Sequence, residues 1–353
     1  MFINNYGGSK MKKIKKIFLL ILLYVFISEL KIVTAQEEDY CAPCRKKGIY
    51  ITSYTATSSK MKKLIELIKN TELDMAIIDV KVDVSSLISD KKKKKIKNVI
   101  EELHRDNIWV AARIVVFRDH TLAKSKPHLA LKKEDDKKWG DSQGVYWVDP
   151  ASEEVWDYNI EIAKQAIDLG FDEINFDYIR FPSDGKLSVI EYPVYNKKIS
   201  KYKIMNAFYK KLRDELKAYK KDIILSADIF GFTLIVKNDL QIGQKLSDLI
   251  KYFDVICPMV YPSHYSKGNF GFKNPVANPY GIIFKTIKAG KITLGKDYIK
   301  IRPWLQDFSI RGVSYDSDMI RLEKKAVYDS NLYGWSLWNA SNNYTKDAID
   351  YAN

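Results

Sequence analysis

The chain has 353 residues, of which 46% are hydrophobic and 29% are charged, with ordinary numbers of glycine and proline. That balance is typical of a globular protein, and a barrel-sized domain of about 250–320 residues would account for most of the chain. The formal net charge is +14, but no nucleic-acid-binding motif accompanies the lysines, so we expect no nucleic-acid partner.

The first 35 residues have the pattern of a secretory signal peptide. A lysine-rich stretch over residues 10–16 precedes a short apolar core over residues 17–30, and a Val-Thr-Ala tripeptide ends at Ala35. The core is too short for a comfortable membrane span, and it contains Glu29. We therefore predict that residues 1–35 are a signal peptide cleaved near Ala35, and that the protein is exported to the periplasm, the cell envelope or the exterior. An uncleaved N-terminal anchor is the alternative.

Outside this segment the positive charge is modest and dispersed. Residues 1–35 contain six lysines and one glutamate, so the remainder has a net charge of about +9. The densest run, residues 91–95, is best explained as the solvated start of a helix. The charge supports a weak attraction to anionic polymers or lipid headgroups, which is compatible with a peripheral association with the envelope. It leaves the oligomeric state open.

The cysteines and histidines give no sign of a metal or cofactor site. Cys41 and Cys44 lie in a short linker, residues 36–47, and in an exported protein they could form a small disulfide. A redox role is less expected because no thioredoxin-type strand precedes them. Cys257 alternates with apolar neighbours in a later strand, as a buried thiol would. The four histidines are dispersed without zinc-type spacing, so we predict neither a metal nor a cofactor.

The rest of the chain, residues 48–353, alternates predicted strands with predicted helices. Apolar segments rich in Ile and Val predict eight strands, at residues 48–56, 75–83, 108–117, 171–182, 223–231, 254–261, 298–306 and 333–339. Helical spacing of apolar residues predicts helices at residues 60–70, 91–105, 152–169, 201–219, 279–289 and 316–330. Ser152, which precedes two glutamates, is expected to cap the third of these helices.

Eight strands buried on both faces and alternating with helices predict a single α/β domain, a (β/α)8 TIM barrel. A doubly wound open sheet is the alternative, but the number of strands and the lack of a glycine-rich phosphate-binding turn disfavour it. The segments after the third, fourth and sixth strands are longer than ordinary βα loops. Such long loops usually build a substrate site.

A carboxylate near the end of the fourth strand is the strongest signal of a functional site. Asn175 and Asp177 share one face of this strand because side chains alternate with period two. Burying a carboxylate in an apolar strand is costly unless the group is used or paired. In a parallel barrel, catalytic residues lie at that end of the strands. The simpler alternative is a structural Asp177 that caps the following loop.

A series of motifs lies on or near the predicted strands, in chain order, at residues 78–81, 112–119, 147–150, 170–182, 226–231, 258–264, 302–306 and 334–339. Together they resemble a bacterial family of glycoside hydrolases with a barrel domain, related in fold to amylase-type barrel glycosidases. The resemblance implies a barrel and hydrolysis of glycosidic bonds. One motif departs from the amylase-type pattern, in which an arginine stands two residues before the nucleophilic Asp of the fourth strand. This chain has Asn175 in that place, and Arg180 comes after the strand.

Glycoside hydrolysis needs two carboxyl groups that flank one bond. Asp177 and Asp228 lie near the ends of neighbouring predicted strands, so a barrel would bring them to the same rim. Asn175 and Ser226 precede them by two residues, on the same faces. We predict Asp177 as nucleophile or charge stabiliser and Asp228 as acid/base. The reverse assignment stays open, and a structural role for Asp228 is the alternative.

Other charged residues near the predicted strands are weaker candidates. Asp79 and Asp83 share a face of the second strand with Lys81, which suggests a paired structural network instead. Three arginines could recognise anionic groups or simply pair with the carboxylates, namely Arg113, Arg180 and Arg302.

We expect a polysaccharide to bind on flat apolar surfaces near the same rim, because the C–H faces of a pyranose stack on aromatic rings. Asn175 and Arg180, beside Asp177, are predicted to contact it as well. Aromatic residues near the ends of the last three strands, with their polar neighbours, complete the predicted substrate contacts: Tyr261, His264, Trp304, Gln306, Trp338 and Asn339.

The predicted function is hydrolysis of O-glycosidic bonds in an envelope or extracellular polysaccharide, with retention of configuration by analogy with amylase-type barrels. A non-catalytic polysaccharide-binding barrel of the cell envelope is the alternative, and a purely structural envelope protein is a third. Only the enzyme should lose turnover and keep binding when one carboxylate is replaced. The sequence does not identify the sugar or its linkage.

Overall fold

The computed structural model describes residues 41–81, 90–310 and 312–352. The predicted signal peptide, residues 1–35, and Asp83 lie outside these ranges. Residues 43–353 form one structural unit. None of the helices in the described part of the chain combines the length and apolarity that a membrane crossing requires.

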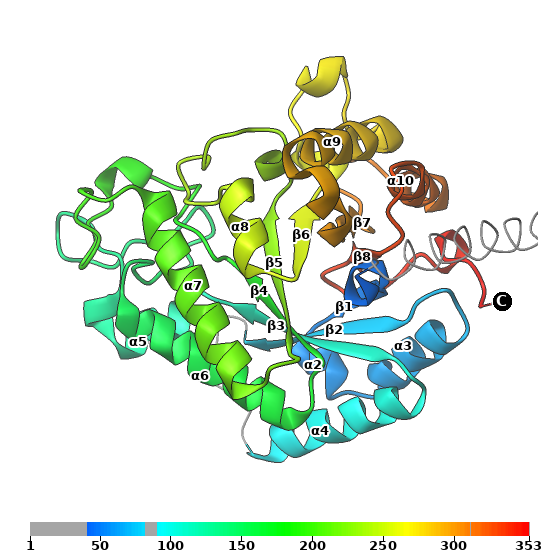
Figure 1. Cartoon of the computed structure of the whole chain (residues 1–353), viewed down its shortest axis with the longest axis horizontal. Coiled ribbons are helices and arrows are strands. Elements are labelled where there is room, and N and C mark those ends of the chain that lie inside the picture. The colour runs from blue at the N-terminus through cyan, green and yellow to red at the C-terminus, as the bar shows by residue number, and fades with distance from the viewer. Residues whose placement is uncertain (1–40, 82–89, 311, 353) are drawn as a thin grey trace, which may run out of the picture. The chain divides into compact units, whose positions relative to one another are not determined.

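Eight parallel strands close into a barrel in which neighbours pair in chain order and the last strand pairs with the first (Figure 1). The strands are β1 (Lys47–Ile51), β2 (Met75–Lys81), β3 (Trp109–Val115), β4 (Glu173–Asp177), β5 (Ile224–Phe230), β6 (Val255–Met259), β7 (Trp304–Gln306) and β8 (Trp335–Trp338). With helices between the strands, this closed barrel confirms the predicted (β/α)8 fold.

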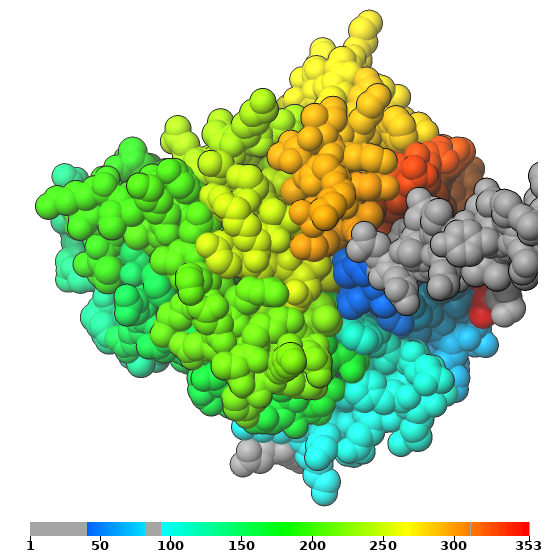
Figure 2. Space-filling model, in the orientation of Figure 1, coloured from blue at the N-terminus to red at the C-terminus, as the bar shows by residue number. Residues whose placement is uncertain are grey.

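Helices cover the outside of the barrel. They are α2 (Ser53–Ala56), α3 (Lys60–Lys69), α4 (Asp90–Arg105), α5 (His120–Ser125), α6 (Glu153–Leu169), α7 (Lys201–Tyr219), α8 (Leu246–Tyr252), α9 (Pro279–Leu294) and α10 (Ser317–Asp329). Figure 2 shows one face on which the side chains of α7, α8 and α9 form the surface. The strands beneath them are buried, as the Ile- and Val-rich sequence predicts.

Alternation along each strand separates an apolar outer layer from a polar interior. On β4, Ile174 and Phe176 belong to the apolar layer between the sheet and the helices, and neither is accessible to solvent. Glu173, Asn175 and Asp177 alternate with them and contact side chains from other strands. The interior of the barrel at β4 therefore holds hydrogen-bonded and ionised groups, which need partners because they are buried.

Helix α6 sets where β4 begins. Ser152 occupies its N-cap position as predicted, but the side chain makes no capping hydrogen bond. Glu153 and Glu154 lie in the first turn, where their negative charges interact favourably with the helix dipole. At the other end Gly170 adopts a left-handed conformation with φ of 102°, which is the usual glycine stop. Because β4 starts three residues later, this stop fixes the position of Asp177 at the far end of the strand.

The strands are shorter than their predicted ranges, and the fourth and seventh fall furthest short, each for a local reason. The fourth strand ends at Asp177 rather than at residue 182, because Tyr178 has a left-handed backbone with φ of 54°. The seventh strand is confined to Trp304–Gln306. Residues 295–300 before it form a 3₁₀ helix, and Pro303 lacks the N–H group that a strand ladder uses.

Candidate active site

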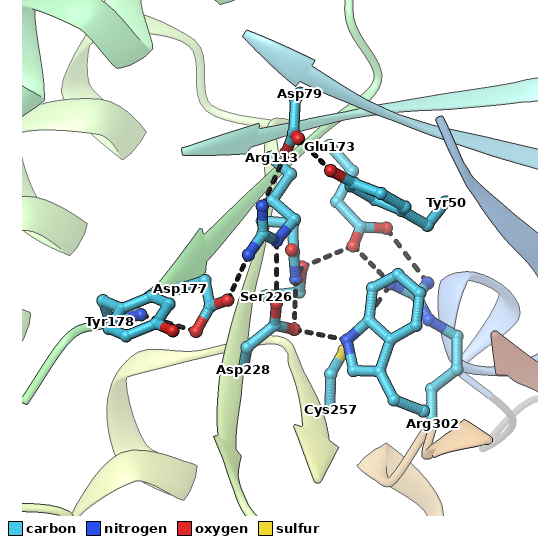
Figure 3. Close-up of polar contacts among 12 residues, drawn as sticks. Tyr50, Asp79, Arg113, Glu173, Asp177, Tyr178, Ser226, Asp228, Cys257 and Arg302 are labelled. Atoms are coloured by element: carbon cyan, nitrogen blue, oxygen red, sulfur yellow. Dashed lines mark hydrogen bonds and ion pairs between the residues drawn. The ribbon is translucent and has the colours of Figure 1, made fainter. Parts of the chain in front are cut away.

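Arg113 on β3 is the centre of a charged group at the carboxyl end of the barrel (Figure 3). Its guanidinium donates to Asp79 Oδ1 at 2.6 Å and to Asp177 Oδ2, and its Nε lies 3.6 Å from Asp228 Oδ2. Arg113 and its three acidic partners are at most 5% exposed. Since buried charges need partners, this single cation holds the ends of four adjacent strands together.

Asp177 and Asp228 line one cavity of about 560 Å³. They lie near the carboxyl ends of the adjacent parallel strands β4 and β5. In the pairing of these two strands, Asn175 lies beside Ser226. A cavity of this size suits a small ligand or a few residues of a longer one. Aromatic rings from the surrounding strands and loops form much of its wall, including Tyr178, Phe230, Phe232, Tyr261, Trp304 and Trp338.

The surroundings of Asp228 favour its protonated form. Burial is the main cause that raises its pKa, followed by the negative charge of Asp177, and the value reaches about 7. Arg113 lowers the pKa in part, as do the hydrogen bonds that Oδ1 accepts from Asn175 Nδ2 (2.9 Å) and Trp304 Nε1 (2.7 Å). A carboxyl group with a pKa near neutrality can both give and take a proton at working pH.

Asp177 is fixed by two donors and by a strained turn. Its Oδ2 accepts from Arg113, and its Oδ1 accepts from the backbone N–H of Tyr178 at 2.6 Å. Bulky residues seldom adopt the left-handed conformation that Tyr178 has, and such strain persists only where the surroundings enforce it. The turn allows the Asp177 carboxylate and the Tyr178 ring to line the same cavity.

Asp79 supports Arg113 from outside the cavity lining. It is fully buried, it accepts from the Tyr50 hydroxyl as well as from Arg113, and burial raises its pKa. The sequence predicts that it pairs with Lys81, but the Lys81 ammonium instead lies 2.8 Å from Asp119. A register shift between Asp79 and Lys81 in the β2–β3 pairing separates the two side chains.

A second buried ion pair lies below the cavity, toward the amino ends of the strands. Arg302 donates through both Nη atoms to the Glu173 carboxylate, and the two side chains are at most 1% exposed. Ser226 also donates to Glu173 (Figure 3). Asn175 in turn donates to Ser226 at 3.0 Å and to Asp228 at 2.9 Å. The hydrogen-bond chain therefore links the segment before β7 with β4 and β5 and holds Asp228 in place.

The structure brings seven of the ten predicted site residues to the cavity, namely Asp177, Asp228, Arg180, Tyr261, His264, Trp304 and Trp338. The other three are amides that bind groups within the protein. Asn175 holds Asp228 from below, and Gln306 accepts from Ser263 N and donates to Phe308 O. Asn339 donates to backbone oxygens of the following loop and of the turn after β7. We therefore assign these amides to shaping the cavity rather than to contacting a ligand.

The sequence left pairing with the carboxylates as one alternative for Arg113, and the structure shows that pairing, but several wall residues were missed. Arg113 interrupts an apolar strand, so the cost argument that pointed to Asp177 applies to it equally. Gln143 comes from the long segment after the third predicted strand, one of the loops that the sequence predicts to build a substrate site. No pattern in the sequence marks Phe232 or Tyr265, which reach the cavity through loops after β5 and β6.

No group of three or more His, Cys, Asp or Glu side chains in the described ranges is arranged to hold a metal ion. At the cavity, the Arg113 guanidinium already lies between the three carboxyl groups that could otherwise share a cation. A metal-independent reaction stays a prediction.

We expect Arg113→Met to lower the free energy of unfolding by about 3–5 kcal/mol at pH 7, because it leaves buried carboxylates without their cation. The loss should grow with pH. Without Arg113 the folded-state pKa values of Asp79 and Asp228 rise further, because Arg113 lowers both of them. The penalty for burying their charges is therefore absent in acid and increases as the two groups ionise. Urea unfolding at pH 5 and pH 8 measures both effects. Arg105→Met, at an exposed residue of α4, is the matched control. Equal stability of the two variants would contradict the shared-cation role.

Enzymes built on a parallel (β/α)8 barrel carry their active sites at the carboxyl ends of the strands. The cavity lies there, so the fold and the cavity define a barrel enzyme. Residues 48–344 match the family described as "Putative glycosyl hydrolase domain". The match spans most of the chain, so the chain belongs to this family and is a glycoside hydrolase.

Two solved enzyme structures illustrate the likeness in fold. An endo-β-1,4-mannanase from Thermotoga petrophila matches 87% of this chain and 72% of its own, with a TM-score of 0.57 and 12% identity. An α-galactosidase from Thermus thermophilus has a TM-score of 0.53 and 11% identity over 84% of this chain, which spans 58% of that enzyme. A hypothetical protein from Ruminiclostridium thermocellum is 33% identical over 51% of this chain and 96% of its own, with a TM-score of 0.44. No curated protein sequence matches the chain.

Proposed function

We propose that this glycoside hydrolase cleaves O-glycosidic bonds by double displacement, with Asp177 as nucleophile and Asp228 as acid/base. The observation that carries this assignment is the difference between the two neighbouring carboxyl groups. Burial and the charge of Asp177 raise the pKa of Asp228 to about 7, whereas Asp177 is bound to the Arg113 guanidinium. Pairs of titratable groups in such contrasting surroundings commonly divide the roles of acid and base.

In the first step Asp228 gives its proton to the glycosidic oxygen as the C–O bond breaks, and Asp177 bonds to the anomeric carbon. Arg113 keeps its bond to Asp79 while Asp177 loses its negative charge. In the second step the ionised Asp228 takes a proton from water, and the water oxygen displaces Asp177 from the sugar. Both carboxyl groups then return to their starting states.

The aromatic residues at β7 and β8 support sugar binding beside this pair. The Trp304 and Trp338 rings meet edge to face with their centroids 5.6 Å apart, and Trp338 also stacks on Tyr50 at 3.9 Å. Trp304 Nε1 donates to Asp228, so the wall and the proposed acid are joined directly. The Trp338 ring is partly exposed, and because these contacts lock it, it can receive the apolar face of a pyranose with little loss of side-chain freedom.

The substrate that we propose is a polysaccharide of the cell envelope or the extracellular space. Two features support this location. Residues 1–35 have the signal-peptide pattern, and Cys41 and Cys44 are disulfide-bonded while Cys257 is a buried free thiol. Disulfides are typical of exported proteins. A peripheral contact with the envelope, carried by the positive net charge, remains part of the same proposal.

The proposal is tested by incubating the purified protein with cell-wall and exopolysaccharide fractions and following new reducing ends. We expect the wild type to release them from at least one fraction. Asp177→Asn should release none from that fraction while still binding it. A wild-type protein that binds a fraction but never releases reducing ends would favour the non-catalytic binding barrel instead.

We expect the first product to keep the anomeric configuration of the substrate. Both Asp177 and Asp228 reach one guanidinium, which favours the short separation of about 5–5.5 Å typical of retaining enzymes over about 6.5–9.5 Å in inverting ones. Proton NMR in the first minutes of reaction, before mutarotation, reads the configuration. An inverted product would make Asp177 a general base that activates water.

A further inference from the structure

Arg180 differs from the two other buried arginines in the described part of the chain. Arg113 pairs with three carboxyl groups, and Arg302 pairs with Glu173. Arg180, in the loop after β4, is only 6% exposed and lines the cavity. It forms no ion pair with any carboxylate in the described part of the chain, although a buried cation is costly without one.

The Arg180 side chain is nevertheless held firmly. Its Nη1 donates to Phe181 O and to Ser183 Oγ, each at 3.0 Å. The guanidinium lies over the rings of Phe230 and Tyr178, 4.4 and 5.0 Å from their centroids. A guanidinium has five N–H donors, so most of its hydrogen-bonding capacity is left for a ligand in the cavity.

Electrostatics around Arg180 also favour the arrival of a negative group. Burial is the main cause that lowers the pKa of Arg180, and the positive charge of Arg118 adds to it. Arg118 itself is bound to Asp141 at 2.8 Å. An anion placed against Arg180 would offset the cost that burial imposes on its positive charge. Natural proteins keep such costly groups chiefly where they are used.

We propose that Arg180 binds an anionic substituent of the sugar, a carboxylate, sulfate ester or phosphate ester, so that the substrate is an acidic polysaccharide. This inference rests on the proposed function, because it takes the cavity as the sugar site. A planar guanidinium fork matches the two oxygens of such groups.

The positions of Arg180 and Trp338 around the barrel allow one bound sugar chain to contact both residues. Arg180 belongs to the loop after β4, and in a closed eight-stranded barrel β4 lies across from β8, which carries Trp338. The carboxyl groups of Asp177 and Asp228 line the cavity with both of them. A ring stacked at β7 and β8 can therefore direct a charged substituent toward Arg180 across the reacting bond.

The test measures binding in the Asp228→Asn background, in which turnover should be about 10²–10⁴-fold slower. The probes are polygalacturonate, a sulfated galactan and a phosphomannan, each with its carboxyl-reduced, desulfated or dephosphorylated form. Affinity electrophoresis should show at least one acidic polymer binding at least tenfold more tightly than its neutral form. The pair that shows the preference identifies the anionic group.

Variants of Arg180 then separate recognition from support of the loop. Arg180→Gln should abolish the preference for the acidic form while binding of the neutral form stays within twofold. Arg180→Lys should keep part of the preference, since it retains the charge but not the planar fork. Arg105→Gln, which removes the same charge at an exposed site of α4, should change nothing.

Three outcomes would overturn the inference. The wild-type site could bind no acidic polymer more tightly than its neutral form, Arg180→Gln could weaken binding of both forms equally, or Arg105→Gln could weaken binding of the acidic form as much as Arg180→Gln does. The reducing-end assay is independent of these. A preference without any hydrolysis would leave Arg180 as an anion-binding residue and refute the enzyme mechanism. If the wild type hydrolyses a polymer and Asp177→Asn does not, but no acidic polymer binds more tightly than its neutral form, the enzyme mechanism would stand and the anion-binding role of Arg180 would be refuted.

Discussion

Asp177→Asn is expected to lower kcat on a cleaved polysaccharide roughly 10⁴-fold, the order of loss seen when a residue acting directly in the chemistry is removed. The amide has the shape of the carboxylate, but it can neither bond to the anomeric carbon nor balance positive charge on the sugar. Binding of the polymer and the thermal unfolding temperature should change little. Initial rates under saturating substrate measure kcat, affinity electrophoresis of the same variant measures binding, and thermal unfolding measures its stability.

Asp79→Asn is the matched control for this experiment. Asp79 also accepts from Arg113 and is also buried, but it is not part of the cavity wall. If Asp177 acts on the substrate, Asp79→Asn should retain far more activity than Asp177→Asn. Equal losses in the two variants would mean that activity follows the orientation of Arg113, and the nucleophile assignment would fail.

The barrel could be predicted from the sequence because its signals are local. Eight apolar segments alternate with helices, and glycine stops such as Gly170 separate them. Strand ends were harder to predict. The motif from residue 171 to 182 continues in apolar residues beyond Asp177, so nothing in its pattern shows that Tyr178 turns into a left-handed conformation. That turn is enforced by the surrounding structure.

The two aspartates could be predicted as neighbours because period-two alternation and strand adjacency are enough to place them on one rim. The partner of Asp177 could not be predicted in the same way. Amylase-type barrels place that arginine on the same strand, whereas here Arg113 reaches Asp177 from β3. Which side chains meet across strands depends on the stagger of the closed barrel, which one strand's sequence does not contain.

The amides show a second limit of sequence reasoning. Gln306 and Asn339 stand close to strand ends, as predicted, but backbone groups of nearby loops take up their hydrogen bonds. An amide has donors and an acceptor that suit a sugar hydroxyl and a loop carbonyl equally well. Position alone therefore does not decide whether such a residue contacts a ligand or supports a loop.

The pH dependence of activity should follow Asp228. A general acid works while it is protonated, and burial together with Asp177 raises its pKa to about 7. On substrates with poor leaving groups, kcat/KM should therefore fall as pH rises through about 7. The free energy of unfolding should also fall as pH rises through this range. The folded-state pKa lies above the ordinary value of 3.8, so the penalty for burying the charge is absent in acid and complete above about pH 7.

Asp228→Asn should lower kcat/KM about 10²–10⁴-fold on polysaccharide, where the leaving oxygen must be protonated. The loss should be much smaller on an aryl glycoside with a good leaving group, and the fall in rate above pH 7 should disappear. Unfolding temperatures at pH 5 and pH 8 are the structural control. Because the variant carries no charge at this site, its stability relative to the wild type should improve from pH 5 to pH 8. Equal losses on both substrates with an unchanged pH profile would assign the proton transfer to another group, and Asp228 would then be a structural carboxyl group held by Asn175 and Trp304.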